Sequence, residues 1–300
     1  METVPFTPSG QGLREAYRYC ADATRAGAKN FYYAFLALPP ARRRAIYAVY
    51  AFSRLCDDVA DGDLALGEKR ERLLDVVDDL DDAYHGQGKG PVLMALWDAA
   101  HRYSIPQKYL EELVRGVEMD LRVRRYQSFD QLYEYCYRVA AVVGLICIQI
   151  FGYRDVRAKE HAIDLGIAMQ LTNIIRDIPE DTGRDRIYLP QDELARWGVS
   201  ERHLLEGIVD ERFQALLAFQ VQRAREYFRR GRRLLPLVPR ASRACPAILG
   251  ELYSRVLDRV ERRGYNVFRE RVTLPAWQKL AIMARAAAQT YVLGSVPRWP

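Results

Sequence analysis

The sequence predicts an all-α protein built around a central cavity, and three observations carry this prediction. Apolar residues recur at helical spacing through most of the 300 residues, whereas the alternation typical of strands is scarce. Gly and Pro interrupt this pattern at intervals that suit helix ends. Two of the apolar segments also carry paired carboxylates. Burying carboxylates in a closed core is costly, so these segments should line a cavity.

Length and composition favour one folded domain inside the cell. The chain has 300 residues, 49% of them hydrophobic, which suffices for a sizeable core, and no long linker divides it. We therefore expect a single all-α domain over residues 1–300, with an ordered core at about 10–293. The five cysteines form no CxxC pair and are odd in number, which favours reduced thiols and a cytoplasmic protein. The four histidines lack the spacing of a zinc site.

Helix boundaries follow from the punctuation of the sequence. Glycines end helices at Gly27 and Gly62, Pro106 suits a first helical turn, and Ser128 is a typical N-cap residue. Residues 85–91 and 183–200 are expected to form loops, the second with a short turn. The expected helices are residues 10–26, a short aromatic segment before Pro39, 41–62, 67–84, 106–125, 129–153, 165–181, 209–235, 241–264 and 275–293.

A polar stripe runs along the helix expected at residues 165–181. The stripe consists of Gln170, Asn173, Arg176, Asp177 and Asp181. Asp177 and Asp181 stand four residues apart and therefore share one helix face, whereas the opposite edge of the helix is apolar. A largely buried helix of this kind should turn its polar stripe toward a cavity. Pro179 should kink the helix and thereby orient Asp181.

The helix expected at residues 41–62 repeats this arrangement. Asp57 and Asp61 are again four apart, with Asp58 beside the first and Arg54 one turn earlier. Two carboxylate pairs on apolar helices repel each other unless positive charge lies between them. Mg²⁺, with Mn²⁺ as an alternative, prefers oxygen ligands and often bridges carboxylates to substrate phosphates. A di-metal oxidase would instead need Glu with ExxH spacing, which this sequence does not offer.

These residue types suit metal-assisted ionisation of an allylic diphosphate. The charge that develops on the leaving diphosphate would be met by metal and by Arg54, Arg138 and Arg176. The carbocation that remains needs an apolar cavity without water. Ala140 and Gly144, in an apolar helix, would let either a neighbouring helix or a long apolar ligand approach the backbone closely.

The sequence offers no sign of secretion or of a transmembrane anchor. The amino terminus lacks the basic start and apolar run of a signal peptide. The most lipophilic segment, residues 139–148, is shorter than the roughly 20 residues that a spanning helix needs. Arginines gather near the carboxyl end at Arg223, Arg225, Arg229, Arg230, Arg232, Arg233, Arg240 and Arg243. We favour a solvated helix face, expect no nucleic-acid partner because no such motif is present, and keep a peripheral membrane contact open.

The motifs together resemble those of the squalene/phytoene synthase family of head-to-head prenyl synthases, over residues 22 to 287. The resemblance rests on DDVAD at 57–61, QLTNIIRDIPEDTGRDRIYLP at 170–190 and YCYRVAAVVG at 135–144. It implies an isoprenoid-synthase helical bundle around a central cavity, in which Mg²⁺ holds two prenyl diphosphates. It also implies a cyclopropyl intermediate, presqualene or prephytoene diphosphate. Some members reduce their product with NADPH, so NADPH use stays open here.

The resemblance implies roles for individual residues as well. Metal ligands would be Asp57, Asp58, Asp61, Asn173, Asp177 and Asp181. Diphosphate contacts would be Arg54, Arg138, Gln170, Arg176, Tyr253 and Arg271, and catalytic residues would be Asp57, Asp61, Asp177, Asp181 and Tyr188. Cavity-lining residues would be Phe31, Phe35, Tyr135, Val139, Ala140, Gly144 and Leu171.

Two segments outside the acidic motifs bear on the branch of the family. KNFYYAF at 29–35 and ERRGYNVFRERV at 261–272 look most like bacterial presqualene diphosphate or squalene synthases associated with hopanoid formation. We therefore rank two farnesyl diphosphates first as substrates, giving presqualene diphosphate and then squalene or dehydrosqualene. A phytoene synthase acting on two geranylgeranyl diphosphates is the alternative. A non-catalytic lipid-binding or assembly protein is remote, because both acidic pairs are intact.

Overall fold

The prediction of an all-α protein is confirmed. The computed structural model describes residues 10–27 and 31–297, and these residues form helices and one isolated β-bridge, between Arg125 and Ile187. The α-helices are α1 (Gly10–Gly27), α2 (Phe31–Phe35), α3 (Pro40–Asp61), α4 (Leu66–Tyr84), α5 (Gly90–Tyr103), α6 (Gln107–Arg122), α7 (Phe129–Cys136), α8 (Val142–Phe151), α9 (Ala158–Arg176), α10 (Ile178–Gly183), α11 (Gln191–Arg196), α12 (Glu201–Glu206), α13 (Glu211–Gly231), α14 (Arg240–Arg262) and α15 (Ala276–Ala287). A π-helical turn η1 (Tyr137–Ala141) joins α7 to α8, a 3₁₀ segment η2 (Arg232–Leu237) follows α13, and a second π-helical turn η3 (Ala288–Val292) follows α15.

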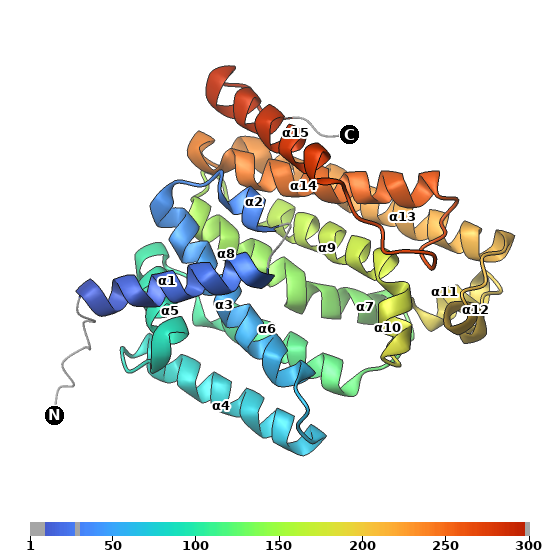
Figure 1. The fold of residues 1–300 in the computed structure, drawn as a ribbon, viewed down its shortest axis with the longest axis horizontal. Helices are drawn as coiled ribbons and strands as arrows, with labels where there is room; N and C mark the ends of the chain where they lie inside the picture. The colour runs from blue at the N-terminus through green and yellow to red at the C-terminus, as the bar shows by residue number, and fades with distance from the viewer. Residues whose placement is uncertain (1–9, 28–30, 298–300) are drawn as a thin grey trace.

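The helices are stacked around a central pair, α8 and α9. Figure 1 shows α13 and α14 on one side of this pair and α3 and α6 on the other, with α4 and α5 further out and α15 outside α14. Glycines allow the central pair to approach closely. A Cβ on Gly144 would lie 2.6 Å from the carbonyl oxygen of Ala162, and one on Gly166 would lie 2.7 Å from that of Ala140. Only a residue without a side chain fits at these crossings.

The run from α7 to α8 was expected as one helix, and it is continuous from Phe129 to Phe151 with the η1 turn inside it. π-helical turns of this kind are frequent at functional sites. The expectation that the lipophilic segment is too short to span a bilayer holds for residues 139–148 but not for the whole helix. Among the described residues this 23-residue run passes a test of length and composition for a membrane span. It also lies at the centre of the bundle, where a soluble protein's core helix passes the same test.

The helix expected at residues 165–181 is two helices. The first, α9, ends at Arg176, and α10 begins at Ile178, so Asp177 lies at the junction. Pro179 lies in the first turn of α10, where its missing N–H costs no hydrogen bond. The direction of the chain therefore changes at Asp177, two residues before the expected kink.

Other boundaries also differ from expectation: α9 begins at Ala158 rather than at residue 165, and the short helix α12 was not predicted. Helix α5 was not predicted, because the glycine-rich linker before it obscured its start. Pro106 is the N-cap of α6 rather than a residue of its first turn. The expected loop at 183–200 contains the short helix α11, and the long helix expected to reach residue 235 ends at Gly231 and tightens into η2, which contains Pro236.

Candidate active site

A cavity of about 350 Å³ runs along the middle of the bundle, between α3, α6, α7–α8, α9 and α14. Its lining residues include Phe31, Phe35, Ile46, Tyr50, Asp57, Leu113, Val117, Asp120, Tyr135, Val139, Ala140, Gly144, Cys147, Phe151, Ala162, Met169, Gln170, Asn173, Leu234, Pro246 and Leu249. Along each helix the polar members lie toward one end. We call Asp57, Asp120, Tyr135, Gln170 and Asn173 the acid-rich end, and Ile46, Cys147, Phe151, Leu234 and Pro246 the floor.

The acid-rich end and the floor are separated by the length of the helices that line the cavity. Cys147 follows Tyr135 by 12 residues on one continuous helical run, so at 1.5 Å per residue the two lie roughly 18 Å apart. Asn173 likewise follows Ala162 on α9, and Asp57 follows Ile46 on α3, by 11 residues each. The cavity is therefore an elongated apolar chamber with its ionisable groups at one end.

The fold brings the two acidic motifs to the same end of the cavity. Arg184, which caps α10, approaches Asp61 at the end of α3 with 4.0 Å between Nη1 and Oδ1. Loss of hydration raises the pKa of Asp57 to about 7, with Asp61 and Asp120 contributing and Arg54 opposing. Loss of hydration also raises the pKa of Asp181 to about 7, with Asp177 and Asp120 contributing. Both carboxylates thus lie where negative charge is incompletely balanced.

Asp120 joins the two acidic motifs, and the sequence analysis missed it. Its carboxylate accepts hydrogen bonds from the Tyr135 hydroxyl at 2.9 Å and from the Tyr188 hydroxyl at 2.7 Å. The rings of Tyr135 and Tyr188 stack at 5.1 Å, and Tyr126 stacks on Tyr188 at 5.7 Å. A signal was available, because Asp120 continues the buried stripe of Val117 and Leu121 on α6, where a carboxylate is out of place.

The loop that carries Tyr188 is held by Arg125. The Arg125 guanidinium donates to the carbonyl oxygen of Asp185 at 2.7 Å and to its Oδ1 at 2.8 Å. The Ile187 amide donates to the Arg124 carbonyl at 2.9 Å. Asp185 has a φ of 57°, a strained value that this clamp sustains. Tyr188 is thereby fixed at the acid-rich end although it belongs to a loop.

Three of the expected diphosphate-binding residues surround Asp177. Arg271 donates to both of its carboxylate oxygens, at 3.0 and 3.1 Å, and Arg176 forms a second ion pair with it. The buried Tyr253 lies beside Arg176 and Asn173, and its ring is 6.0 Å from that of Phe31. These guanidinium groups border the acid-rich end, where an incoming diphosphate could compete with Asp177 for them.

The donor atoms at the acid-rich end suit a divalent cation. The Oδ1 atom of Asn173 is buried and has no hydrogen-bond partner, while its amide nitrogen donates to Gln170. A buried oxygen of this kind requires a ligand, and a hard cation satisfies it. Asp57 and Asn173 line this end of the cavity, and Asp61 and Asp181 lie close enough to Asp57 and Asp120 to affect the pKa values there. The residues that would hold the cation are Asp57, Asp58, Asp61, Asn173, Asp177 and Asp181. All six offer oxygen atoms, as Mg²⁺ prefers.

A different group of metal-type ligands lies outside this site. Glu160, His161 and Asp164 have ligand atoms within 4.8 Å of one another at the start of α9. The Arg230 guanidinium already pairs with Asp164 at 3.3 Å. This group lies at the opposite end of α9 from Asn173 and has no part in the acid-rich end.

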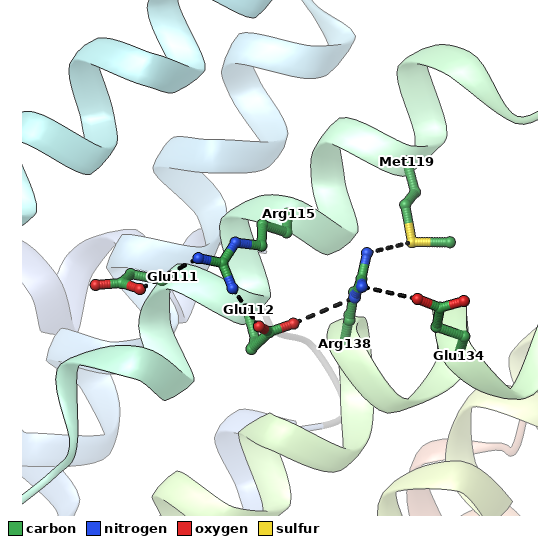
Figure 2. Close-up of polar contacts among 6 residues, drawn as sticks. All are labelled: Glu111, Glu112, Arg115, Met119, Glu134 and Arg138. Atoms are coloured by element: carbon green, nitrogen blue, oxygen red, sulfur yellow. Dashed lines mark hydrogen bonds and ion pairs between the residues drawn. The ribbon is translucent and has the colours of Figure 1, made fainter.

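Some expected site residues do not line the cavity. Arg54, an expected diphosphate contact, is half exposed and pairs with Asp58 at 2.7 Å. Figure 2 shows the Arg138 guanidinium between Glu112, Glu134 and Met119, with nitrogen–oxygen distances of 3.2 and 2.7 Å to the two carboxylates. The η1 turn places Arg138 beside α6, where the two carboxylates pair with its guanidinium, and Arg138 does not line the cavity. Leu171 is buried but does not line the cavity, since Gln170 takes that face of α9.

The metal-free protein should lose stability as pH rises from about 4 to about 7. The pKa values of Asp57 and Asp181 are raised to about 7 in the folded state, so the folded chain binds more protons than the unfolded chain in this window. We expect the melting temperature at pH 8 to lie a few degrees below that at pH 6, by about 2–4 °C. The double variant Asp57→Asn, Asp181→Asn should show a smaller difference, and Mg²⁺ with inorganic pyrophosphate should stabilise most at pH 8. An unchanged difference in the double variant would contradict this prediction.

An elongated apolar chamber that carries arginines and oxygen ligands at one end defines a class of protein, the enzymes that act on prenyl diphosphates. Residues 24–278 match the family model described as squalene/phytoene synthase. The chain belongs to the squalene/phytoene synthase family, whose members are prenyltransferases that join prenyl diphosphates head to head and use divalent metal.

Relatives and solved structures agree on this family. The chain is 36% identical to a 15-cis-phytoene synthase of Synechococcus elongatus, over 98% of this chain and 100% of the relative. It is 39% identical to a phytoene synthase of Mycobacterium tuberculosis, over 94% of each chain. A dehydrosqualene synthase structure with bound ligand is 28% identical, with a TM-score of 0.86 over 93% of this chain and 97% of that one. Squalene synthase HpnC from Alicyclobacillus acidocaldarius is also 28% identical, with a TM-score of 0.81 over 86% and 97%.

Proposed function

We propose that this protein condenses two geranylgeranyl diphosphates and is a phytoene synthase. The observation that carries the condensation is the cavity that has Asp57 and Asn173 at one end, beside the other carboxylates of the two acidic motifs, and an apolar floor roughly 18 Å away. The longer substrate is supported by identities of 36–39% to phytoene synthases along nearly the whole chain, against 28% for the two solved squalene-type synthases. This ordering reverses the one that sequence motifs favour.

In the proposed reaction, the carbon–oxygen bond of one allylic diphosphate breaks and the diphosphate leaves with the electron pair. A divalent cation supplies charge neutralisation for that leaving group when it is bound. Arg176 and Arg271, which border the acid-rich end, would donate to the diphosphate oxygens. The double bond of the second substrate attacks the allylic cation, and loss of one proton closes a cyclopropane that still carries the second diphosphate. That diphosphate then leaves with its electron pair, the ring opens as the cation rearranges, and loss of a second proton gives phytoene. The apolar walls exclude water that would otherwise quench the cation.

Asp120 would orient the two tyrosine hydroxyls beside the reacting carbons. The Asp120→Asn variant should therefore lower kcat by about 10²- to 10³-fold, the usual cost of losing one preorganised polar partner. KM should change little, because Asp120 makes no contact with the arginines that would hold the diphosphate. Tyr126→Phe is the matched control, since Tyr126 packs in the same aromatic stack and its hydroxyl has no hydrogen-bond partner. Equal losses in both variants would indicate a packing role only.

A second candidate is condensation of two farnesyl diphosphates to presqualene diphosphate and onward to squalene or dehydrosqualene. The observation that favours it is the TM-score of 0.86 to a dehydrosqualene synthase, together with the aromatic pair of Phe31 and Phe35 that lines the cavity. The two candidates share every step at the acid-rich end. They differ in the length of chain that the cavity accepts.

The deciding experiment is incubation of the purified protein with Mg²⁺ and either geranylgeranyl or farnesyl diphosphate, with and without NADPH, followed by mass analysis of extracted lipid. The proposal predicts phytoene from the longer substrate, independent of NADPH. Squalene or dehydrosqualene from the shorter substrate alone would favour the second candidate. No product from either substrate would contradict both and revive a binding role.

A further inference from the structure

The outer face of α15 and η3 exposes large apolar side chains. Trp277 and Leu280 are 67% and 57% exposed, and Val292 and Leu293 are 79% and 72% exposed. Single exposed apolar residues are ordinary on a protein surface, but several large ones along one segment indicate an interaction site. Figure 1 shows α15 on the outside of the bundle, along α14.

The exposed residues form one stripe of an amphipathic helix. At 3.6 residues per turn of α15, Trp277, Leu280, Ala281 and Ala284 lie on one face, and the exposed Val292 and Leu293 follow at the end of η3. The opposite face is buried against α14 through Ile282 and Ala286. The fold therefore uses only half of this apolar helix and leaves the other half toward solvent.

The charge around the stripe is positive. No Asp or Glu follows Glu270 in the sequence. The Arg240 side chain donates to the carbonyl oxygens of Thr290 and Tyr291 at 2.6 Å each, so the start of α14 lies directly beside η3. Arg154 and Arg243 lie beside Arg240. Loss of hydration, together with the neighbouring guanidinium groups of Arg154 and Arg240, lowers the pKa of Arg243. We call Arg154, Arg240 and Arg243 the basic cluster.

The arginines of α13 do not supply such a surface, although the sequence groups them with Arg240 and Arg243. Arg223 pairs with the largely buried Glu193, and Arg225 pairs with Asp258 at 3.0 Å. Their charge is balanced within the fold. Of the arginines near the carboxyl end, Arg240 contacts η3 and Arg243 lies beside it, so the basic cluster is the positive charge next to the apolar stripe.

The basic cluster also lies close to the floor of the cavity. Arg42 at the start of α3 donates to the Ser242 hydroxyl at 2.9 Å, and that hydroxyl donates to the carbonyl oxygen of Phe151 at 3.3 Å. Phe151 is a floor residue, and Ser242 follows Arg240 by two residues. The Tyr291 hydroxyl reaches the Ala37 carbonyl at 2.8 Å, which ties η3 to the segment after α2.

We propose that the stripe on α15 and η3, together with the basic cluster, docks on the surface of a lipid bilayer that contains anionic lipid. A tryptophan and aliphatic side chains suit the boundary between headgroups and acyl chains, and each nearby arginine gains about 1 kcal/mol from an anionic surface. An acidic protein partner would not need the apolar stripe, and a second copy of this chain would meet its own basic cluster. The docking face brings the floor of the cavity toward the lipid, into which a water-insoluble hydrocarbon could pass. Only this last point rests on the proposed function.

Vesicle flotation of the purified full chain tests the proposal without any assay of activity. Wild-type protein should float with vesicles of phosphatidylcholine and phosphatidylglycerol at least about tenfold more than with phosphatidylcholine alone. Raising NaCl from about 0.1 to about 1 M shortens the Debye length from about 10 to about 3 Å and should remove most of this difference. The double variant Val292→Asp, Leu293→Asp should lose at least about tenfold in binding.

A matched control replaces apolar residues of similar exposure elsewhere. Leu74 on α4 and Leu205 on α12 are 64% and 63% exposed, and the variant Leu74→Asp, Leu205→Asp should bind like the wild type. Circular dichroism of both variants would establish that they fold. Absence of wild-type binding, or equal binding by both double variants, would overturn the proposal. Light scattering gives a further test. If the wild type is a dimer and the variant Val292→Asp, Leu293→Asp is a monomer, a second copy of the chain covers the stripe and the proposal is overturned. None of these outcomes bears on the condensation reaction.

Discussion

Replacing either Asp57 or Asp177 by Asn is expected to lower turnover by about 10³-fold or more while the protein stays folded. Each change removes one anionic oxygen from the set that would hold the divalent cation, and lost charge stabilisation of several kcal/mol corresponds to a loss of this size. Folding should persist, since the raised pKa of Asp57 shows that its charge is not stabilised by the fold. Asp177→Asn also weakens the ion pairs with Arg176 and Arg271.

A matched control for these variants is Asp79→Asn on α4. Asp79 is exposed on the acidic face of that helix, away from the cavity, and its replacement should leave kcat unchanged. Product formation from radiolabelled substrate, with melting temperatures for every variant, gives the comparison. Activity within about tenfold of wild type in both Asp57→Asn and Asp177→Asn would rule out the acid-rich end as the reaction site.

Filling the floor with Cys147→Phe is expected to change the substrate that the enzyme accepts. Cys147 lines the cavity roughly 18 Å from Tyr135, so an aromatic ring there shortens the chamber without touching the acid-rich end. Turnover of geranylgeranyl diphosphate should fall by about 10²-fold, because misplacing a substrate commonly costs that much. Turnover of the shorter farnesyl diphosphate should change by less than about threefold, because its chain does not reach the floor. Competition between the two substrates in one reaction, read by mass analysis of products, measures the change.

Ala140→Phe provides the internal comparison for Cys147→Phe. Ala140 follows Tyr135 by only five residues, roughly 8 Å along the helix, so its replacement should block both substrates while inorganic pyrophosphate and Mg²⁺ still bind. Gly144 lines the same wall but cannot serve, because a side chain there would collide with the Ala162 backbone and separate α8 from α9. Equal loss of both substrates in Cys147→Phe would mean that the floor does not set chain length.

Much of this protein could be predicted from local sequence, because apolar and polar residues repeat with the period of an α-helix. Helical spacing identified α1, α3 and α4 within one or two residues, and spacing of four placed Asp57 with Asp61 on one face. The same rule placed Gln170 and Asn173 toward a cavity, as the structure has them. A pattern of this kind depends on the geometry of a single helix and needs no knowledge of its neighbours.

Residues whose position depends on a second helix could not be predicted in this way. Arg138 shares a helix with Tyr135, yet the η1 turn and the carboxylates of Glu112 and Glu134 hold it away from the cavity. Asp120 was not identified from the sequence, because its two tyrosine partners come from α7 and from the loop before α11.

By itself, the sequence determined that this protein is all-α, that two helices carry paired carboxylates along apolar faces, and that these pairs require a cation. Only the tertiary structure decided that Asp57 and Asn173 line one end of one cavity, that Asp120 lies close to both acidic motifs, and that the outer face of α15 is uncovered within the described residues. The physical reason is that periodicity specifies which residues share a face of one helix, whereas contact between faces depends on close packing of several helices at once.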